Sequence, residues 1–232
     1  MDRVLSYGLM APVVKERRVY SSALRQKQAQ LTRRGILEAG RRLLAKGAYS
    51  AVTMEEIAVE AGVSYQTVYA VFGNKLRLAE AIIDEGWPHI AEARKLIEEA
   101  RRSDDPEFWL RAAARVSRRI LEVCADLPRF MRESGDPTLR ARYQRIEEDR
   151  YAEFQEFSGF LERSGRLREG LSAVEAHAVL WGLTGADWYC LLVYQRHWEP
   201  ARYEEWLAQA LVDLLLRPRV LPAAGPQASS RP

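Results

Sequence analysis

Apolar residues recur at helical spacing along most of the chain, and no segment alternates apolar and polar residues as a half-buried strand does. The pattern predicts an all-α fold. Glycine, proline and capping residues mark the ends of the elements, and Gly86-Trp87-Pro88 predicts a kink, because proline removes a helical hydrogen bond. The predicted helices span residues 24–46, 53–61, 64–72, 74–102, 106–125, 128–132, 137–164, 172–197 and 200–216.

The segment 53–72 carries the local signals of two short helices joined by a tight turn. Thr53 is a candidate N-cap, and Glu56 three residues later completes a capping box. Gly62 stands where the first helix must end, at a position that suits positive φ. Ser64 caps the second helix. This spacing is typical of a DNA-binding helix-turn-helix, and the alternative is an ordinary pair of packed helices.

The second of these helices divides into a buried and an exposed face. Val68 and Phe72 lie four residues apart on the buried face. A helix that reads the major groove needs outward side chains that form hydrogen bonds and carry no negative charge. The outward positions have this character: Tyr65, Gln66, Thr67 and Tyr69.

The run from Ile57 to Leu78, I-A-x-x-A-G-V-S-x-x-T-V-Y-x-x-F-G-x-K-x-x-L, resembles the DNA-binding segment of the TetR family of transcriptional regulators. The resemblance implies phosphate-side roles for Tyr69 and Lys75, and for the start of the first helix. Asn74 departs from the usual Ser or Asp but caps a helix equally well. The expected DNA-binding residues are Thr32, Arg33, Thr53, Ser64, Tyr65, Gln66, Thr67, Tyr69 and Lys75.

The charge distribution agrees with a basic DNA-binding part and a separate body. Residues 15–77 hold 12 Lys/Arg against 5 Asp/Glu, whereas residues 78–232 hold 22 against 26. Arginine is abundant throughout, so this asymmetry only supports the motif. The expected organisation is a flexible basic arm, a helix-turn-helix domain, an effector-binding and dimerisation domain implied by the resemblance, and a disordered tail, over residues 1–23, 24–78, 79–216 and 217–232.

Aromatic residues concentrate beyond residue 86, which holds all six Trp and five of the six Phe. They are candidates for the effector pocket that the resemblance implies, or they fill an ordinary core. Asp187 lies among apolar residues, so we expect it to bind the effector, to pair with an arginine such as Arg118, or to lie at a solvated edge. The candidate ligand-binding residues are Trp87, Phe108, Trp109, Phe130, Tyr143, Phe154, Trp181, Asp187 and Trp188.

A homodimer on a near-palindromic duplex is expected, because one recognition helix contacts too few base pairs for adequate affinity. In the family the last two helices form the dimer interface. Gly182 and Gly185 allow close helix crossing. An apolar stripe in the last helix suits the same role: Trp206, Leu207, Leu211, Leu214 and Leu215.

Catalysis is disfavoured. His89, His177 and His197 form no metal-spaced cluster, and no glycine-rich phosphate loop is present, so we expect neither metal nor cofactor. Cys124 and Cys190 lie far apart in apolar stretches, which favours a reducing cytoplasm. No segment has the length and apolar character of a signal peptide or a membrane span.

The sequence therefore predicts a repressor that a small, largely apolar effector releases from its operator, with the kink near Pro88 as the hinge. The alternatives are an activator or a ligand-independent DNA-binding protein of the same fold, or a helical adaptor protein.

Overall fold

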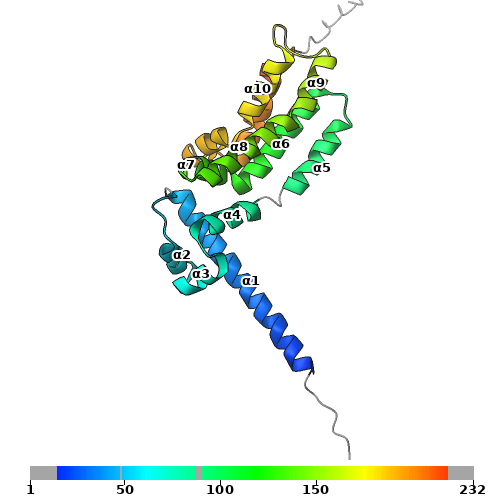
Figure 1. The fold of residues 1–232 in the computed structure, drawn as a ribbon. Coiled ribbons are helices and arrows are strands. Elements are labelled where there is room, and N and C mark those ends of the chain that lie inside the picture. The colour runs from blue at the N-terminus through cyan, green and yellow to red at the C-terminus, as the bar shows by residue number, and fades with distance from the viewer. Residues whose placement is uncertain (1–14, 48, 87–89, 219–232) are drawn as a thin grey trace, which may run out of the picture. The chain divides into compact units, whose positions relative to one another are not determined.

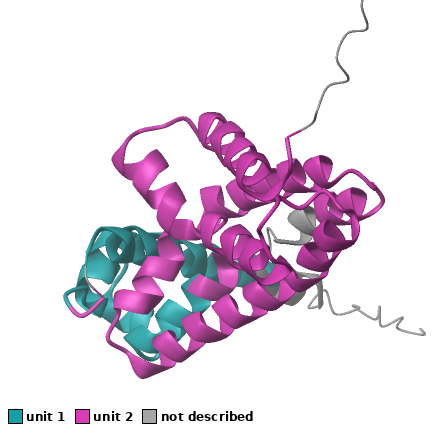
Figure 2. Ribbon diagram, turned by 90° about the horizontal axis from the view of Figure 1, so that it is seen from above, with its two compact units in different colours: residues 1–47, 51–82 teal, residues 48–50, 83–232 magenta. Residues whose placement is uncertain are grey.

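The computed structural model describes residues 15–47, 49–86 and 90–218. The chain divides into two compact units (Figure 2), one comprising residues 1–47 and 51–82 and the other residues 48–50 and 83–232. Every regular element of the described residues is a helix (Figure 1), apart from one isolated bridge between Leu167 and Leu216. The all-α prediction is confirmed.

The first unit is a three-helix module with the start of a fourth helix packed into it. Its elements are α1 (Lys15–Lys46), α2 (Met54–Ala61), α3 (Tyr65–Phe72) and the part of α4 (Lys75–Gly86) up to Ile82. Their apolar faces meet in one core, because each helix places its buried residues at intervals of three or four. The core includes Ile36, Ala39, Leu44, Ile57, Ala58, Val68, Phe72, Leu78 and Ile82.

Gly40 marks the close crossing of α1 and α4. A Cβ atom at this position would lie 2.9 Å from Leu78 Cδ2 and 3.1 Å from Ile82 Cδ1, both on buried side chains. Gly35, on the same helix, has no such neighbour within 4 Å of its Cβ position. Gly40 is therefore required by packing, whereas Gly35 only costs helix propensity.

Helix α1 begins at Lys15, so the boundary predicted at residue 24 was wrong. Residues 15–23 lack the apolar stripe by which the sequence pattern predicts a helix. Residues 15–23 contain neither proline nor glycine, so no residue among them interrupts the helix. The side chains of residues 23–30 are all exposed. In Figure 1 this part of α1 extends beyond α2 and α3. Residues 1–14 lie outside the described residues.

The second unit is a helical bundle built around α6 (Pro106–Cys124), which packs against α5 (Ile90–Arg101) and α12 (Pro200–Leu215). The connecting elements are α7 (Asp126–Glu133), α8 (Pro137–Glu153), α9 (Gln155–Arg163), α10 (Ala173–Leu183), α11 (Ala186–Tyr189) and the π-helix η1 (Cys190–Gln195). The buried core includes Leu110, Ala114, Leu121, Phe157, Leu161, Leu180, Tyr189, Tyr203, Leu207 and Leu211.

Two helices predicted as continuous are broken. The predicted helix 137–164 divides at Phe154, which ends α8 and begins α9. The predicted helix 172–197 divides at Thr184 and Gly185, and Gly185 takes an extended conformation before α11. The region around the predicted kink also differs from one continuous helix, since α4 ends at Gly86 and α5 begins at Ile90. Trp87 and Pro88 lie outside the described residues.

Most of the apolar side chains along α12 pack inside the second unit and are not exposed to a partner. Leu207, Leu211 and Leu215 are each fully buried in the core of the second unit, so their prediction as dimer contacts was wrong. Leu214 is 44% exposed and Trp206 is partly buried. The exposed apolar side chains nearby in sequence belong to α11 and η1: Trp188, Leu191 and Tyr194.

Candidate nucleic-acid interface and effector cavity

The turn between α2 and α3 has the geometry that its capping residues predict. The Thr53 side chain accepts a hydrogen bond from the Glu56 amide, and Glu56 accepts one from the Thr53 amide in return, at 2.8 Å. Gly62 has φ of 66°, in the left-handed region that suits glycine. Ser64 accepts from the Thr67 amide at 3.2 Å. These local bonds fix the start of α3 independently of the rest of the chain.

Helix α3 presents an exposed face of polar and aromatic side chains. Val68 and Phe72 are buried and anchor the helix. Tyr65 and Tyr69 are 40% and 56% exposed, and their ring centroids lie 6.1 Å apart along this face. Gln66 is exposed, and Thr67 is half-buried with its hydroxyl 2.9 Å from that of Ser64. Ser64 and Thr67 are thus partly used by the cap, whereas Tyr65, Gln66 and Tyr69 are available for recognition.

Two predicted cationic residues lie beside the ends of the short helices. The Lys75 ammonium donates to the Val52 carbonyl at 2.9 Å, next to the residue that caps α2. The Arg33 guanidinium lies over the Phe72 ring, 4.8 Å from its centroid. Arg33 is exposed, and Thr32 is half-buried one residue before it. The first unit therefore contains all nine predicted DNA-binding residues.

The second unit contains a cavity of about 480 Å³ bounded by α5, α6, α8, α9 and the turn between α10 and α11. This volume is within the range of small-molecule sites. Trp109 forms part of the wall, where its ring stacks on Phe157 and its indole N–H donates to the Ser103 carbonyl at 2.9 Å. Further apolar lining comes from Ile97, Ala112, Ala113, Val116, Ile120, Leu121, Ile146 and Phe154.

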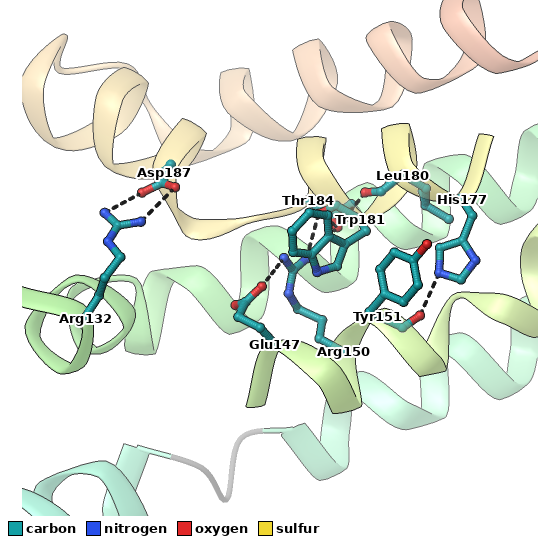
Figure 3. A network of polar contacts seen from close by, with 9 residues as sticks. All are labelled: Arg132, Glu147, Arg150, Tyr151, His177, Leu180, Trp181, Thr184 and Asp187. Atoms are coloured by element: carbon teal, nitrogen blue, oxygen red, sulfur yellow. Dashed lines mark hydrogen bonds and ion pairs between the residues drawn. The ribbon is translucent and has the colours of Figure 1, made fainter. Parts of the chain in front are cut away.

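Arg150 organises the polar edge of this cavity (Figure 3). From α8 it binds Glu147 at 2.7 Å and donates to the Trp181 carbonyl at 2.8 Å. It also lies 3.2 Å from the Thr184 hydroxyl and stacks over the Trp181 ring. The Thr184 hydroxyl in turn donates to the Leu180 carbonyl. Arg150 and Thr184 thus satisfy the Trp181 and Leu180 carbonyls, which lie in the last turn of α10.

Of the eight predicted ligand-binding residues that the structure describes, Trp109 and Phe154 line this cavity. Phe108 is 49% exposed, Phe130 is buried in α7, and Trp188 is 39% exposed. The Arg150 guanidinium lies over the Trp181 ring. Neither Trp181 nor Tyr143 is among the lining residues. Trp87 lies outside the described residues. Glu147 and Arg150 could not be predicted as lining residues from the sequence, because charged residues on a largely polar helix resemble a solvated face.

Asp187 does not line the cavity. Its carboxylate is 76% exposed and accepts two hydrogen bonds from Arg132, each 3.2 Å long (Figure 3). The Asp187 hydrogen bond raises the pKa of the Arg132 guanidinium, against the opposing effect of burial. Of the three alternatives left open for Asp187, an arginine partner and a solvent-exposed position both agree with the structure, but the arginine is Arg132. Arg118 pairs with Glu204 and Glu122 instead.

The histidines and cysteines that the structure describes all lie in the second unit: His177, His197, Cys124 and Cys190. Among the described residues, no group of three or more His, Cys, Asp or Glu side chains is arranged to hold a metal ion. The Cys124 thiol donates to the Ile120 carbonyl at 3.2 Å, and burial raises the pKa of the Cys190 thiol. His177 is buried, with Nε2 2.7 Å from the Tyr151 carbonyl. Within the described part of the chain, no helix has the length and apolar character needed to span a membrane.

Comparison with known proteins connects the first unit with a family. Residues 36–82 match the family model of bacterial regulatory proteins, tetR family. This segment covers most of the first unit, including the capped turn and the recognition face. A search of curated proteins found no match.

Solved structures share the fold of the chain. NalD of Pseudomonas aeruginosa, the secondary repressor of the MexAB-OprM multidrug efflux pump, has a TM-score of 0.56 at 23% identity, over 82% of this chain and 98% of NalD. FadR of Bacillus subtilis, solved with stearoyl-CoA, has a TM-score of 0.58 at 17% identity, over 78% and 97%.

A TetR family regulator from Chloroflexus aurantiacus has a TM-score of 0.64 at 17% identity, over 82% of this chain and 95% of the regulator. At these identities the likeness concerns the fold. Taken together, the matches show that residues 36–82 carry the helix-turn-helix of the tetR family and that the chain has the fold of TetR-family regulators.

Proposed function

We propose that this protein is a homodimeric repressor that binds a near-palindromic operator and leaves it when a small, largely apolar effector binds. The observation that carries the proposal is the exposed face of α3, where Tyr65, Gln66 and Tyr69 project from a helix anchored by buried Val68 and Phe72. Amide and hydroxyl groups held on a rigid helix are suited to base edges and phosphates in the major groove.

Phosphate contacts would come from the ends of the short helices. Arg33 and Lys75 supply positive charge, and Thr53 stands at the N-terminus of α2, where the helix dipole favours an anion. Phosphate contacts position the protein on the duplex but do not distinguish one base sequence from another, whereas a contact between Gln66 and a base edge would.

A homodimer follows from the size of the reading surface, because α3 has only eight residues. The exposed apolar side chains of the second unit offer surface for self-association: Trp188, Leu191, Tyr194 and Leu214. Apolar groups of this size gain free energy when a second copy covers them, at roughly 25 cal/mol for each Å² removed from water.

The cavity supports effector control. Its volume suits a small molecule, and its walls are mostly apolar. Helix α4 begins in the first unit and continues past the unit boundary at Ile82. Among the relatives, NalD is described as a repressor and FadR was solved with stearoyl-CoA. An effector releases DNA only to the extent that it binds the DNA-free state more tightly.

A nuclease-protection experiment on the DNA flanking the protein's own gene tests this proposal. We expect one protected segment with two related half-sites, lost when Gln66 and Tyr69 are both replaced by alanine. The same double substitution should leave the thermal melting of the protein nearly unchanged, because both side chains are exposed. Uniform protection of all fragments, or none, would contradict the proposal.

A further inference from the structure

The charged side chains around the cavity are predominantly acidic. Among the side chains that the structure describes, four glutamates and two arginines line it, with a combined formal charge of −2 at neutral pH: Glu98, Glu147, Glu153, Glu156, Arg101 and Arg150. The rest of the wall is apolar or uncharged. A ligand that fills this cavity therefore meets a negative potential, which water and salt partly screen where the carboxylates are exposed to solvent.

Both arginines already have carboxylate partners. Arg101 lies 2.7 Å from Glu156, and Arg150 lies 2.7 Å from Glu147. Arg150 also binds the Trp181 carbonyl, so moving it toward an anionic ligand would break several contacts at once. The cavity therefore presents no uncommitted arginine to a carboxylate or a phosphate.

The uncompensated charge belongs to Glu98 on α5 and Glu153 on α8. Neither has an ion-pair partner among the described residues, and both side chains are exposed where they border the cavity. Glu147 is better shielded, with a side chain only 20% exposed. Its Oε2 binds Arg150, so this pair contributes a dipole rather than a net charge.

We propose that the effector is a compact amphipathic cation, with an apolar or aromatic body in the cavity and a positive group near Glu98 and Glu153. This inference rests on the proposed function in one respect, namely that the cavity is the effector site. Aromatic faces such as Trp109 add favourable contacts with a cation. An acyl-CoA, which is anionic, would meet the same carboxylates unfavourably.

Two ions of nearly equal size and shape but opposite charge separate this proposal from simple apolar binding. Tetraphenylphosphonium and tetraphenylborate are titrated into the intact DNA-free protein by calorimetry. We expect the cation to bind at least about tenfold more tightly than the anion, with an affinity that falls as salt is added. Ala113→Trp, which fills the lined space, should abolish binding of the cation and so locate it.

Matched charge variants test the named carboxylates. Glu98→Gln with Glu153→Gln should weaken binding of the cation roughly threefold to tenfold. The control pair, Glu148→Gln with Glu162→Gln, makes the same charge change at exposed positions that do not line the cavity, and should change the affinity less than about twofold.

Equal or tighter binding of tetraphenylborate by the wild-type protein would overturn the inference, as would failure of both ions to bind at about 1 mM. DNA binding is measured separately on the same preparation. A protein that binds its operator but prefers the anion remains a regulator with another effector class, whereas a protein that binds no DNA contradicts the proposed function itself.

Discussion

The Lys75 ammonium donates a hydrogen bond to the Val52 carbonyl, 2.9 Å away, immediately before the residue that caps α2. This bond joins the start of α4 to the start of α2 within one unit. It restricts a long, flexible side chain and holds its charge beside a helix N-terminus, where the dipole also favours an anion. The Lys75 ammonium is therefore well placed to bind a DNA phosphate. Removing this side chain should change how DNA affinity depends on salt concentration.

Lys75→Ala should weaken binding to all duplex sequences and lower the slope of log affinity against log salt by about one unit per subunit, because one phosphate contact is lost. Fluorescence anisotropy over a range of salt concentrations measures this slope. Lys95→Ala removes an exposed lysine from the second unit and is the matched control. An unchanged slope in Lys75→Ala would show that Lys75 does not contact phosphate.

Gln66→Ala should relax the preference at one base position and cost about 1–3 kcal/mol on the preferred site, because an amide that pairs with a base edge is lost. The exposed side chain makes no internal packing contact that the folded state needs. Binding to a panel of single-base operator variants measures the change. If the ranking of the panel matches that of the wild type, Gln66 does not read sequence.

The two glycines of α1 should respond oppositely to substitution. Gly35→Ala should stabilise the first unit by about 0.5–1 kcal/mol, because the helix gains propensity and the new Cβ meets nothing. Gly40→Val should destabilise it by about 1–3 kcal/mol, because the side chain collides with buried Leu78 and Ile82. Urea denaturation measures both effects. A stabilising Gly40→Val would contradict the close crossing of α1 and α4.

Asp187→Asn should change the free energy of unfolding by less than about 1 kcal/mol, because its pair with Arg132 is largely exposed to solvent. It should leave effector affinity unchanged, because Asp187 does not line the cavity. Chemical denaturation and calorimetry check the two expectations. A large loss of effector affinity in Asp187→Asn would show that Asp187 does contact the effector.

The elements that depend on neighbouring residues were predictable from the sequence. The caps of α2 and α3 depend on Thr53, Glu56, Gly62 and Ser64, whose hydrogen bonds span three or four residues. A local pattern therefore determines their geometry, and the observed helices begin one residue after each cap. The recognition face follows from the same register, since Val68 and Phe72 fix which side of α3 is buried.

The cavity that we propose as the effector site is formed by contacts between distant segments, and the sequence pattern did not reveal which residues line it. Arg150 satisfies the carbonyl of Trp181, thirty-one residues away, and this bond accompanies the break between α10 and α11. The aromatic composition predicted Phe130 and Trp188 as lining residues, but Phe130 is buried outside the cavity lining and Trp188 is partly exposed. Leu211 likewise fits an interface or a core equally well in sequence, and only the packing of α12 assigns it to the core.

Selection of binding sites from random duplex DNA tests the central claim most directly. The account predicts enrichment of one near-palindromic site that binds two copies of the chain, with half-sites separated by about one helical turn of DNA or a multiple of it. The doubly substituted Gln66→Ala, Tyr69→Ala protein should enrich no such site. Recovery of unrelated sequences by the wild-type protein, or binding of one copy without symmetry, would contradict the account.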